Sequence, residues 1–187
     1  MARNVEDKRS RLVRAATELS HTRGWANLSL ADIAESADVP LGNVYYYFKT
    51  RAAIGEAVLA QRTSELDAVR EACDAASSPR ARLKAFIQMT VDSRDVLARA
   101  GCPVGSLCAE LSKDAGSLAD RAAIPFRNLL GWLEEQFAAL GRKEDRRLLA
   151  LHLLAALQGV SLLANCFSDP SVVMREAKYL KTWIEEL

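Results

Sequence analysis

The chain is predicted to be all-α, with an N-terminal helical domain at residues 1–50 and a larger helical domain at residues 51–187. Apolar residues recur at helical spacing along nearly its whole length, whereas no alternating run or Asn-Gly turn predicts a strand. Glycine, proline and serine interrupt this pattern and divide it into about nine helices. With 187 residues and 26% charged residues, the chain has the length and composition of a folded globular protein.

The N-terminal domain is expected to hold three helices. The first runs from about residue 5 to residue 23, with Leu12 and Leu19 on its buried face and Gly24 as its stop signal. The second begins after Ser29, whose hydroxyl can cap it, and Asp32 three positions later completes a capping box. Its apolar residues recur at helical spacing, so the helix has one buried face.

A tight turn and a short third helix follow. Asp38 lies at the turn, where an aspartate tolerates left-handed backbone better than most residues, and Pro40 suits the first turn of the next helix. The inward face of that helix is predicted to be Leu41, Val44 and Phe48. Two short helices joined in this way form a helix-turn-helix, which can place its second helix in a DNA major groove.

These residues resemble the tetracycline-repressor (TetR) family of bacterial transcription regulators. The matching motifs are Gly24-Trp25, Leu28-Ser29, Ile33-Ala34, Ala37-Asp38-Val39 and Tyr45-Tyr46-Tyr47-Phe48-Lys49. The chain departs from the family pattern at Asp38, where glycine is usual, and at Pro40, where a small polar residue is usual. The resemblance implies DNA binding by Ser29, Leu41, Gly42, Asn43, Tyr45, Tyr46, Tyr47 and Lys49. The alternative is a helical hairpin whose tyrosines are core residues.

Charge alone does not predict a nucleic-acid-binding protein. The formal net charge is +1, and cations only slightly outnumber anions in the N-terminal domain. DNA binding must therefore depend on individually placed contacts to phosphates and bases, and not on a basic tail.

The second domain is predicted to contain the remaining helices. Thr50 can cap a long fourth helix, and Pro79 starts another that continues to a loop at residues 101–105. A short helix near residues 107–111 comes next, and longer ones are expected at 118–140, 144–167 and 171–187.

The middle of the chain, from Phe86 to Trp132, is where members of the TetR family usually bind a small molecule. The run Gly101-Cys102-Pro103-Val104-Gly105-Ser106-Leu107, together with Glu110-Leu111, resembles a branch of the family that senses drugs or flavonoid-type aromatics. The candidate lining is Phe86, Met89, Thr90, Cys108, Leu111, Phe126, Leu129, Trp132 and Gln158. Apolar walls with a few polar groups suit a ligand pocket, but the same residues are equally compatible with an ordinary core.

Residues 148–168 contain no charged side chain, so their helix is apolar on every side. A membrane span is not favoured, because polar residues and Gly159 interrupt the segment and no aromatic belt flanks it. A soluble helix of this kind needs a partner subunit, and the resemblance likewise implies a homodimer built from the last two long helices. The predicted interface is His152, Ala155, Gly159, Leu162, Cys166, Leu180, Trp183 and Ile184. The polar stripe of Gln158, Ser161 and Asn165 is expected either to orient a ligand or to bond across this interface.

The sequence does not favour an enzyme. It has no phosphate-binding loop and no nucleophile elbow, and its two histidines are isolated, so no catalytic residue, metal site or cofactor is predicted. Without a signal peptide, its four irregularly spaced cysteines are expected to be reduced thiols of a cytoplasmic protein. Cys102 and Cys108 lie close enough in sequence for a redox pair, but small buried hydrophobic residues are the favoured interpretation.

Three functions remain open at this point. The first is a repressor released from a palindromic operator by a small, largely apolar ligand. The second is an effector-independent DNA-binding regulator or architectural factor. The third is a helical scaffold that binds protein.

Overall fold

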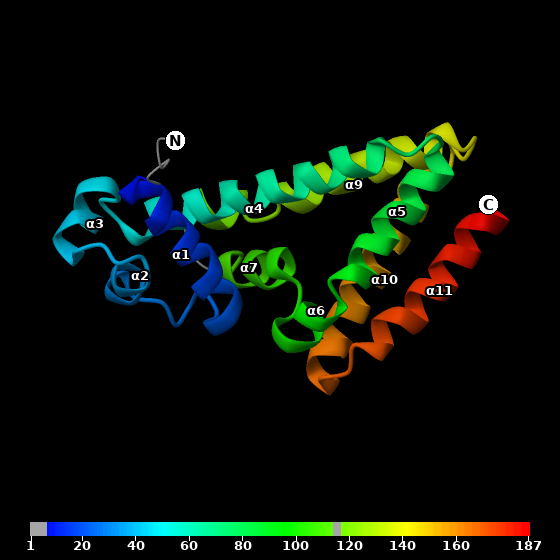
Figure 1. The fold of residues 1–187 in the computed structure, drawn as a ribbon. Coiled ribbons are helices and arrows are strands. Elements are labelled where there is room, and N and C mark those ends of the chain that lie inside the picture. The colour runs from blue at the N-terminus through cyan, green and yellow to red at the C-terminus, as the bar shows by residue number, and fades with distance from the viewer. Residues whose placement is uncertain (1–6, 114–116) are drawn as a thin grey trace, which may run out of the picture. The chain divides into compact units, whose positions relative to one another are not determined.

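The computed structural model describes residues 7–113 and 117–187, and over these residues the chain forms eleven α-helices without a strand (Figure 1). The helices are α1 (Lys8–Arg23), α2 (Leu30–Ser36), α3 (Leu41–Tyr47), α4 (Arg51–Asp74), α5 (Pro79–Asp92), α6 (Arg94–Ala100), α7 (Pro103–Leu111), α8 (Ser117–Arg121), α9 (Ile124–Ala139), α10 (Arg146–Phe167) and α11 (Ser171–Glu186). The predicted all-α fold is confirmed.

Two predicted helices are each divided in the structure, which raises the number of helical segments. The helix expected from residue 79 is interrupted at Ser93, whose backbone N–H closes the last turn of α5 on Met89 O. The helix expected at 118–140 is divided between α8 and α9. The loop expected at 101–105 is shorter than predicted, because Pro103 is already the first residue of α7. The expected start of the first helix at residue 5 lies outside the described residues.

The chain forms two compact units, which are described separately. The first unit comprises Met1–Ser64 and Ser106–Ala123, and the second comprises Glu65–Gly105 and Ile124–Leu187. The units do not divide at residue 50, since α4 contributes residues to both and the segment 106–123 packs with the N-terminal helices. This association of distant segments depends on tertiary contacts, which helical periodicity does not reveal.

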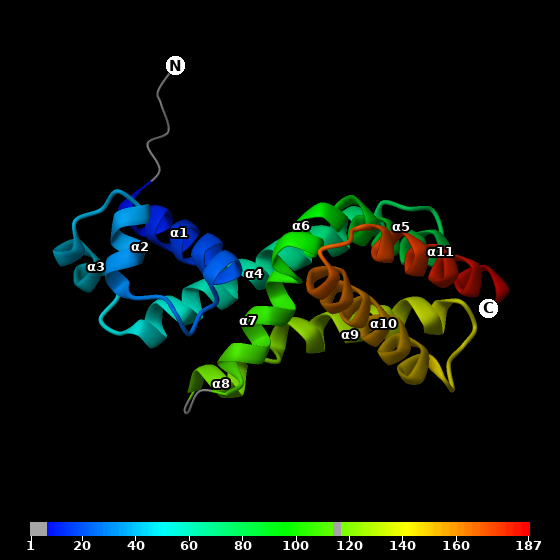
Figure 2. The same ribbon diagram turned by 90° about the horizontal axis from the view of Figure 1, so that it is seen from below.

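The core of the first unit brings α1, α2 and α3 together with the start of α4 (Figure 2). Leu12 and Ala16 of α1 are fully buried, as are Val44 of α3 and Ile54 of α4. Arg62 of α4 donates a hydrogen bond to the backbone oxygen of Thr17, at 2.9 Å. The two short helices are therefore supported by α1 and the first half of α4.

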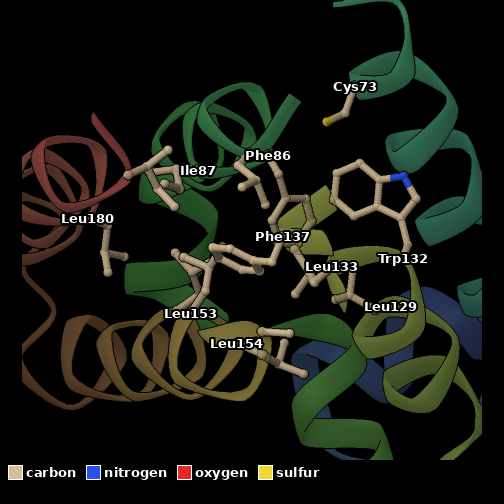
Figure 3. Packing of buried hydrophobic residues seen from close by; sticks show 14 of the residues in the cluster. Cys73, Phe86, Ile87, Leu129, Trp132, Leu133, Phe137, Leu153, Leu154 and Leu180 are labelled. Carbon is tan, nitrogen blue, oxygen red and sulfur yellow. The ribbon is translucent and has the colours of Figure 1, made fainter. Parts of the chain in front are cut away.

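The core of the second unit lies among α5, α9, α10 and α11 (Figure 3). The rings of Phe86 and Trp132 meet edge to face, with centroids 5.8 Å apart, and Phe137, Leu153 and Leu180 pack beside them. The indole N–H of Trp132 donates to Asp74, at 3.0 Å. These side chains fill the space between the helices with large apolar groups.

Helix α10 is buried on one side and exposed on the other. Leu153, Leu157 and Val160 belong to the core, whereas Leu151, Leu162 and other apolar residues face outward. By length and composition the helix is apolar enough to cross a membrane, and 39% of that apolar window is buried inside the chain. The exposed remainder is the apolar surface for which the sequence predicted a partner subunit.

Candidate nucleic-acid interface

The first helix of the helix-turn-helix begins with a complete capping box. The Ser29 hydroxyl oxygen accepts a hydrogen bond from the backbone N–H of Asp32, at 3.1 Å, and the Asp32 carboxylate accepts one from the backbone N–H of Ser29, at 2.9 Å. Hydrogen bonds from the Ser29 side chain and backbone lower the pKa of Asp32 below its ordinary value. The carboxylate therefore stabilises the start of α2 above that ordinary pKa, and this contribution is lost as the pH falls through the lowered pKa.

The turn between α2 and α3 is held by a side chain from α1. Asp38 has a φ of 50°, the left-handed conformation predicted for it. Arg11 donates to the backbone oxygens of Ala37 and Asp38, at 2.5 and 2.6 Å, and to the Asp38 carboxylate, at 3.0 Å. A single guanidinium thus fixes the backbone where the chain changes direction.

The third helix is anchored by two buried side chains. Val44 and Phe48 are 0% and 3% exposed, and the Arg9 guanidinium lies 5.3 Å from the Phe48 ring centroid. The prediction that Leu41 also points inward is wrong, because its side chain is 43% exposed. Pro40 does not lie within the first turn as predicted, because it precedes α3, where its carbonyl accepts from the backbone N–H of Asn43, at 2.8 Å.

The outward side of α3 carries most of the residues predicted to bind DNA. Tyr45 and Tyr46 are 51% and 75% exposed, which contradicts the alternative that the tyrosines are core residues. The half-buried Tyr47 ring meets Tyr46 edge to face, with centroids 5.0 Å apart. The remaining predicted contacts are also on the surface: Leu41, Gly42, Lys49 and Ser29 are exposed, and Asn43 is half-buried. This arrangement presents aromatic and polar groups from one short, braced helix.

Comparisons with known proteins agree with this geometry. Residues 12–58 match the sequence profile of the bacterial regulatory proteins of the tetR family. An uncharacterized HTH-type transcriptional regulator from Lactococcus lactis is 26% identical to the chain, over 98% of this chain and 96% of that protein. A TetR transcriptional regulator from Legionella pneumophila shares the fold, with a TM-score of 0.86 at 20% identity, over 96% of this chain and 98% of that one.

The chain belongs to the TetR family. It is therefore a DNA-binding transcriptional regulator, as predicted. The transcriptional repressor NemR of Escherichia coli is 30% identical over 63% of this TetR-family chain, and the match spans 62% of NemR.

The predicted ligand-binding residues of this TetR-family chain are divided between the two compact units. Cys108 and Leu111 belong to the first unit, whereas the others belong to the second. Within the second unit, Phe86, Leu129 and Trp132 are buried core residues, and Phe126 packs against that core. Met89 is exposed and Thr90 is half-buried. The Gln158 carboxamide oxygen lies 2.5 Å from where a Cβ on Gly105 would be, so it packs against the backbone of α7.

The predicted interface residues fall into two groups. The five on α10, from His152 to Cys166, are all exposed and form one stripe. Leu180 and Ile184 of α11 are instead buried in the core of the chain's own second unit, which removes them from any surface offered to a partner. Trp183 of α11 is half-buried, and its ring centroid lies 5.0 Å from that of His152 on α10.

The polar stripe of Gln158, Ser161 and Asn165 was expected to orient a ligand or to form hydrogen bonds across the dimer interface. Two of its three side chains instead form hydrogen bonds within the chain. Ser161 donates to the backbone oxygen of Leu157, at 2.7 Å, and Asn165 donates to that of Ala98, at 3.2 Å.

The cysteines are free thiols, but they do not share one environment. Cys73 and Cys108 are buried as predicted, and burial raises the pKa of the Cys73 thiol. Cys102 is half-buried, so the expectation that it is a buried residue is wrong, and Cys166 is exposed on the stripe of α10 predicted to meet a partner. Among the described residues no cluster of histidines, cysteines and carboxylates has the composition of a metal site.

Arg11 belongs to the site, although no sequence pattern predicted it. We expect Arg11→Ala to lower the free energy of unfolding by about 1–3 kcal/mol, because two backbone carbonyls and one carboxylate lose their donor. The free energy of operator binding should fall by more than the free energy of unfolding, because the turn sets the direction of α3. Thermal unfolding and DNA binding of the purified variant measure the two effects, and unchanged DNA binding would show that the turn keeps its geometry without Arg11. Arg99→Ala, at an exposed position of α6, is the charge-matched control.

Proposed function

We propose that this regulator is a cytoplasmic, homodimeric repressor that binds a palindromic operator and is released by a small, largely apolar ligand. The observation that carries the proposal is the exposed side of α3, fixed by Val44, Phe48 and the Arg11 turn. A helix held in this way can enter a major groove without refolding. A twofold dimer presents two such helices, which is why the operator is expected to be a palindrome.

The contacts to DNA divide into two kinds. Asn43 and Tyr46 are proposed to contact base edges, because both are polar residues of α3 that are not buried in the core. Phosphate contacts are assigned to Ser29, Tyr45, Tyr47 and Lys49, while Leu41 and Gly42 approach the groove at the start of the helix. In the part of the chain that the structure describes, no atom beyond the two adjoining residues and the nearby helix backbone lies within 4 Å of a Cβ placed on Gly42, so this end of α3 is open.

The exposed stripe of α10 supports the dimer. A groove of about 350 Å³ runs between α10 and α11, with walls that include Gly159, Leu163 and Tyr179. Nearby Phe167 is 63% exposed, although a large aromatic ring is normally covered in a soluble protein. A second copy of the chain would cover this surface.

An open groove in the second unit includes one of the predicted ligand-binding residues. Trp132 lies at the edge of this groove of about 470 Å³, which is otherwise lined by polar side chains, among them Asp74 and Arg70. The close packing of Phe86, Leu129 and Trp132 supports a second candidate function, an effector-independent regulator. Ligand binding would then be absent, and control would come from the abundance of the protein.

Replacing Lys49 tests the interface. Lys49→Ala should weaken binding to every duplex alike, and should reduce the slope of log affinity against log salt by about one unit per half-site, or about two units for the dimer, because one phosphate in each half-site loses its cation. Filter binding across a salt series, on the selected operator and on random duplexes of equal length, gives both slopes. Lys143→Ala, an exposed lysine of the second unit, is the charge-matched control. If the wild-type protein prefers no palindrome over random DNA, the repressor proposal is wrong.

A displacement screen tests the effector. Lipophilic antibiotics, flavonoids and fatty-acid derivatives are added to the protein–operator complex, and each hit is examined by thermal unfolding of the protein alone. A true effector should release the operator and also raise the melting temperature, because it binds the folded state. A hundredfold release requires about 2.7 kcal/mol of coupling between the two sites. Compounds that release DNA while lowering the melting temperature act by unfolding, and a screen with only such hits would favour the effector-independent regulator.

A further inference from the structure

The turn between α1 and α2 is contacted by a residue from far along the chain. The Glu110 carboxylate of α7 accepts a hydrogen bond from the backbone N–H of Ala26, with Oε2 2.8 Å from the nitrogen. Both residues belong to the first compact unit, in which the segment 106–123 packs with the N-terminal helices. The hydrogen bond joins positions 84 residues apart in sequence.

The backbone of this turn is shaped around the carboxylate. Gly24 has a φ of +81°, and a Cβ at that position would lie 3.1 Å from Glu110 Oε1 and 3.4 Å from Oε2. A side chain at Gly24 would therefore be strained by its own backbone conformation and would also press on the carboxylate. The absence of a side chain there gives Glu110 access to the backbone of Ala26.

Other groups fix the two sides of the same turn. The Arg51 guanidinium lies 4.7 Å from the Trp25 ring centroid and donates to the Trp25 backbone oxygen. Helix α4 approaches Trp25 so closely at Gly55 that a Cβ there would lie 2.9 Å from the indole ring. The Glu110 bond is directed at the segment between Trp25 and Ser29, which is the residue that caps α2.

We propose that Glu110 is a positioning residue for operator recognition. It holds the backbone three residues before Ser29, and so fixes where α2 starts and, through the Arg11 turn, where α3 lies. The inference rests on the proposed DNA contacts of Ser29 and α3. Base recognition tolerates displacements of only about 0.5 Å, whereas non-specific attraction to phosphates does not require this accuracy. Loss of the bond therefore reduces binding to the operator more than binding to random DNA.

The test compares Glu110→Ala with Glu110→Gln. An amide oxygen still accepts a hydrogen bond from Ala26, so the glutamine variant keeps the contact while losing the charge. Asp120→Ala is the control, because it removes one negative charge from an exposed position of the same segment. The DNA probes are a duplex selected from a random pool by the wild-type protein and an unselected duplex of the same length. Melting temperature and hydrogen exchange of the Ala26 amide are measured on the same samples.

In Glu110→Ala, the ratio of affinities for the selected and unselected duplexes should fall about tenfold, the size expected for a lost hydrogen bond to a charged group. Its melting temperature should fall by no more than about 2–4 °C, as expected for one lost hydrogen bond in a chain of this size, and its Ala26 amide should exchange faster. Glu110→Gln should restore most of the ratio, and Asp120→Ala should match the wild type.

Three results would overturn the proposal. They are an unchanged ratio in Glu110→Ala, an equal loss of binding to both duplexes accompanied by a lower melting temperature, and a glutamine variant as impaired as the alanine one. If the wild-type protein selects no sequence at all, the proposed function fails first, while the Ala26 exchange still reports whether the contact exists.

Discussion

Replacing Gly159 by leucine is expected to abolish the dimer and, with it, binding to a palindromic operator. Gly159 is exposed on α10, and among the described residues no atom other than those of its two chain neighbours and the helix's own nearby backbone lies within 4 Å of a Cβ placed there. A single chain can therefore accept the leucine, whereas a partner helix packed against this stripe cannot. Overpacking costs about 1–3 kcal/mol per site, or about 2–6 kcal/mol for the two copies in a symmetric dimer. Sedimentation velocity measures the oligomeric state, and operator binding is measured at the same concentrations.

The chain offers a matched control for this experiment. Gly131 of α9 is also an exposed helical glycine, and a Cβ placed on it would likewise have no such neighbour within 4 Å. Gly131→Leu should leave both the dimer and operator binding unchanged, because it makes the same change on another helix. If Gly159→Leu remains a dimer, the interface lies elsewhere on α10, and the neighbouring stripes that contain Leu151 and Leu163 are the next to examine.

Replacing the two proposed base-contacting residues is expected to remove operator specificity. Asn43→Ala and Tyr46→Ala should each lower affinity for the operator by about 1–3 kcal/mol per half-site, because a contact to a base edge is lost. The loss is counted twice in a symmetric dimer, so it reaches about 2–6 kcal/mol for each variant. Affinities for a set of operators that carry every single base change measure the effect position by position.

The pattern across these operators distinguishes the two kinds of contact. A base-contacting variant should lose its preference at one position in each half-site while keeping the others. Lys49→Ala should instead lower all affinities by the same factor, since a phosphate is present at every sequence. A uniform loss in Asn43→Ala or Tyr46→Ala would reassign that residue to the DNA backbone.

The N-terminal helices were predictable because their signals are local. The Ser29–Asp32 capping box, the left-handed Asp38 and the Thr50 cap each depend on residues within a few positions of one another. Helical spacing likewise predicted the buried faces of α1 and α2. Leu41 was misassigned because an apolar residue at the first position of a short helix has no preceding turn to pack against.

The exposed stripe of α10 was predictable for a different reason. A 22-residue helix that carries charge only at its first two positions must be covered on all sides, and one small chain does not supply enough neighbours. The positions on α11 were not predictable in the same way. Leu180 and Ile184 follow the apolar pattern of that helix, but the pattern is the same whether a residue packs inside its own chain or against another.

By itself, the sequence determined the all-α fold, the helix-turn-helix with its caps, and the membership of a DNA-binding family, because all of these are encoded in short-range patterns and motifs. Only the tertiary structure decided which distant residues support that motif. Arg11 reaches the turn across 26 residues, and Glu110 reaches Ala26 across 84. Such contacts do not appear in the hydrophobic periodicity of the sequence. A single polar residue at a surface position has the same kind of neighbours in sequence whether its side chain is solvated or holds another segment in place.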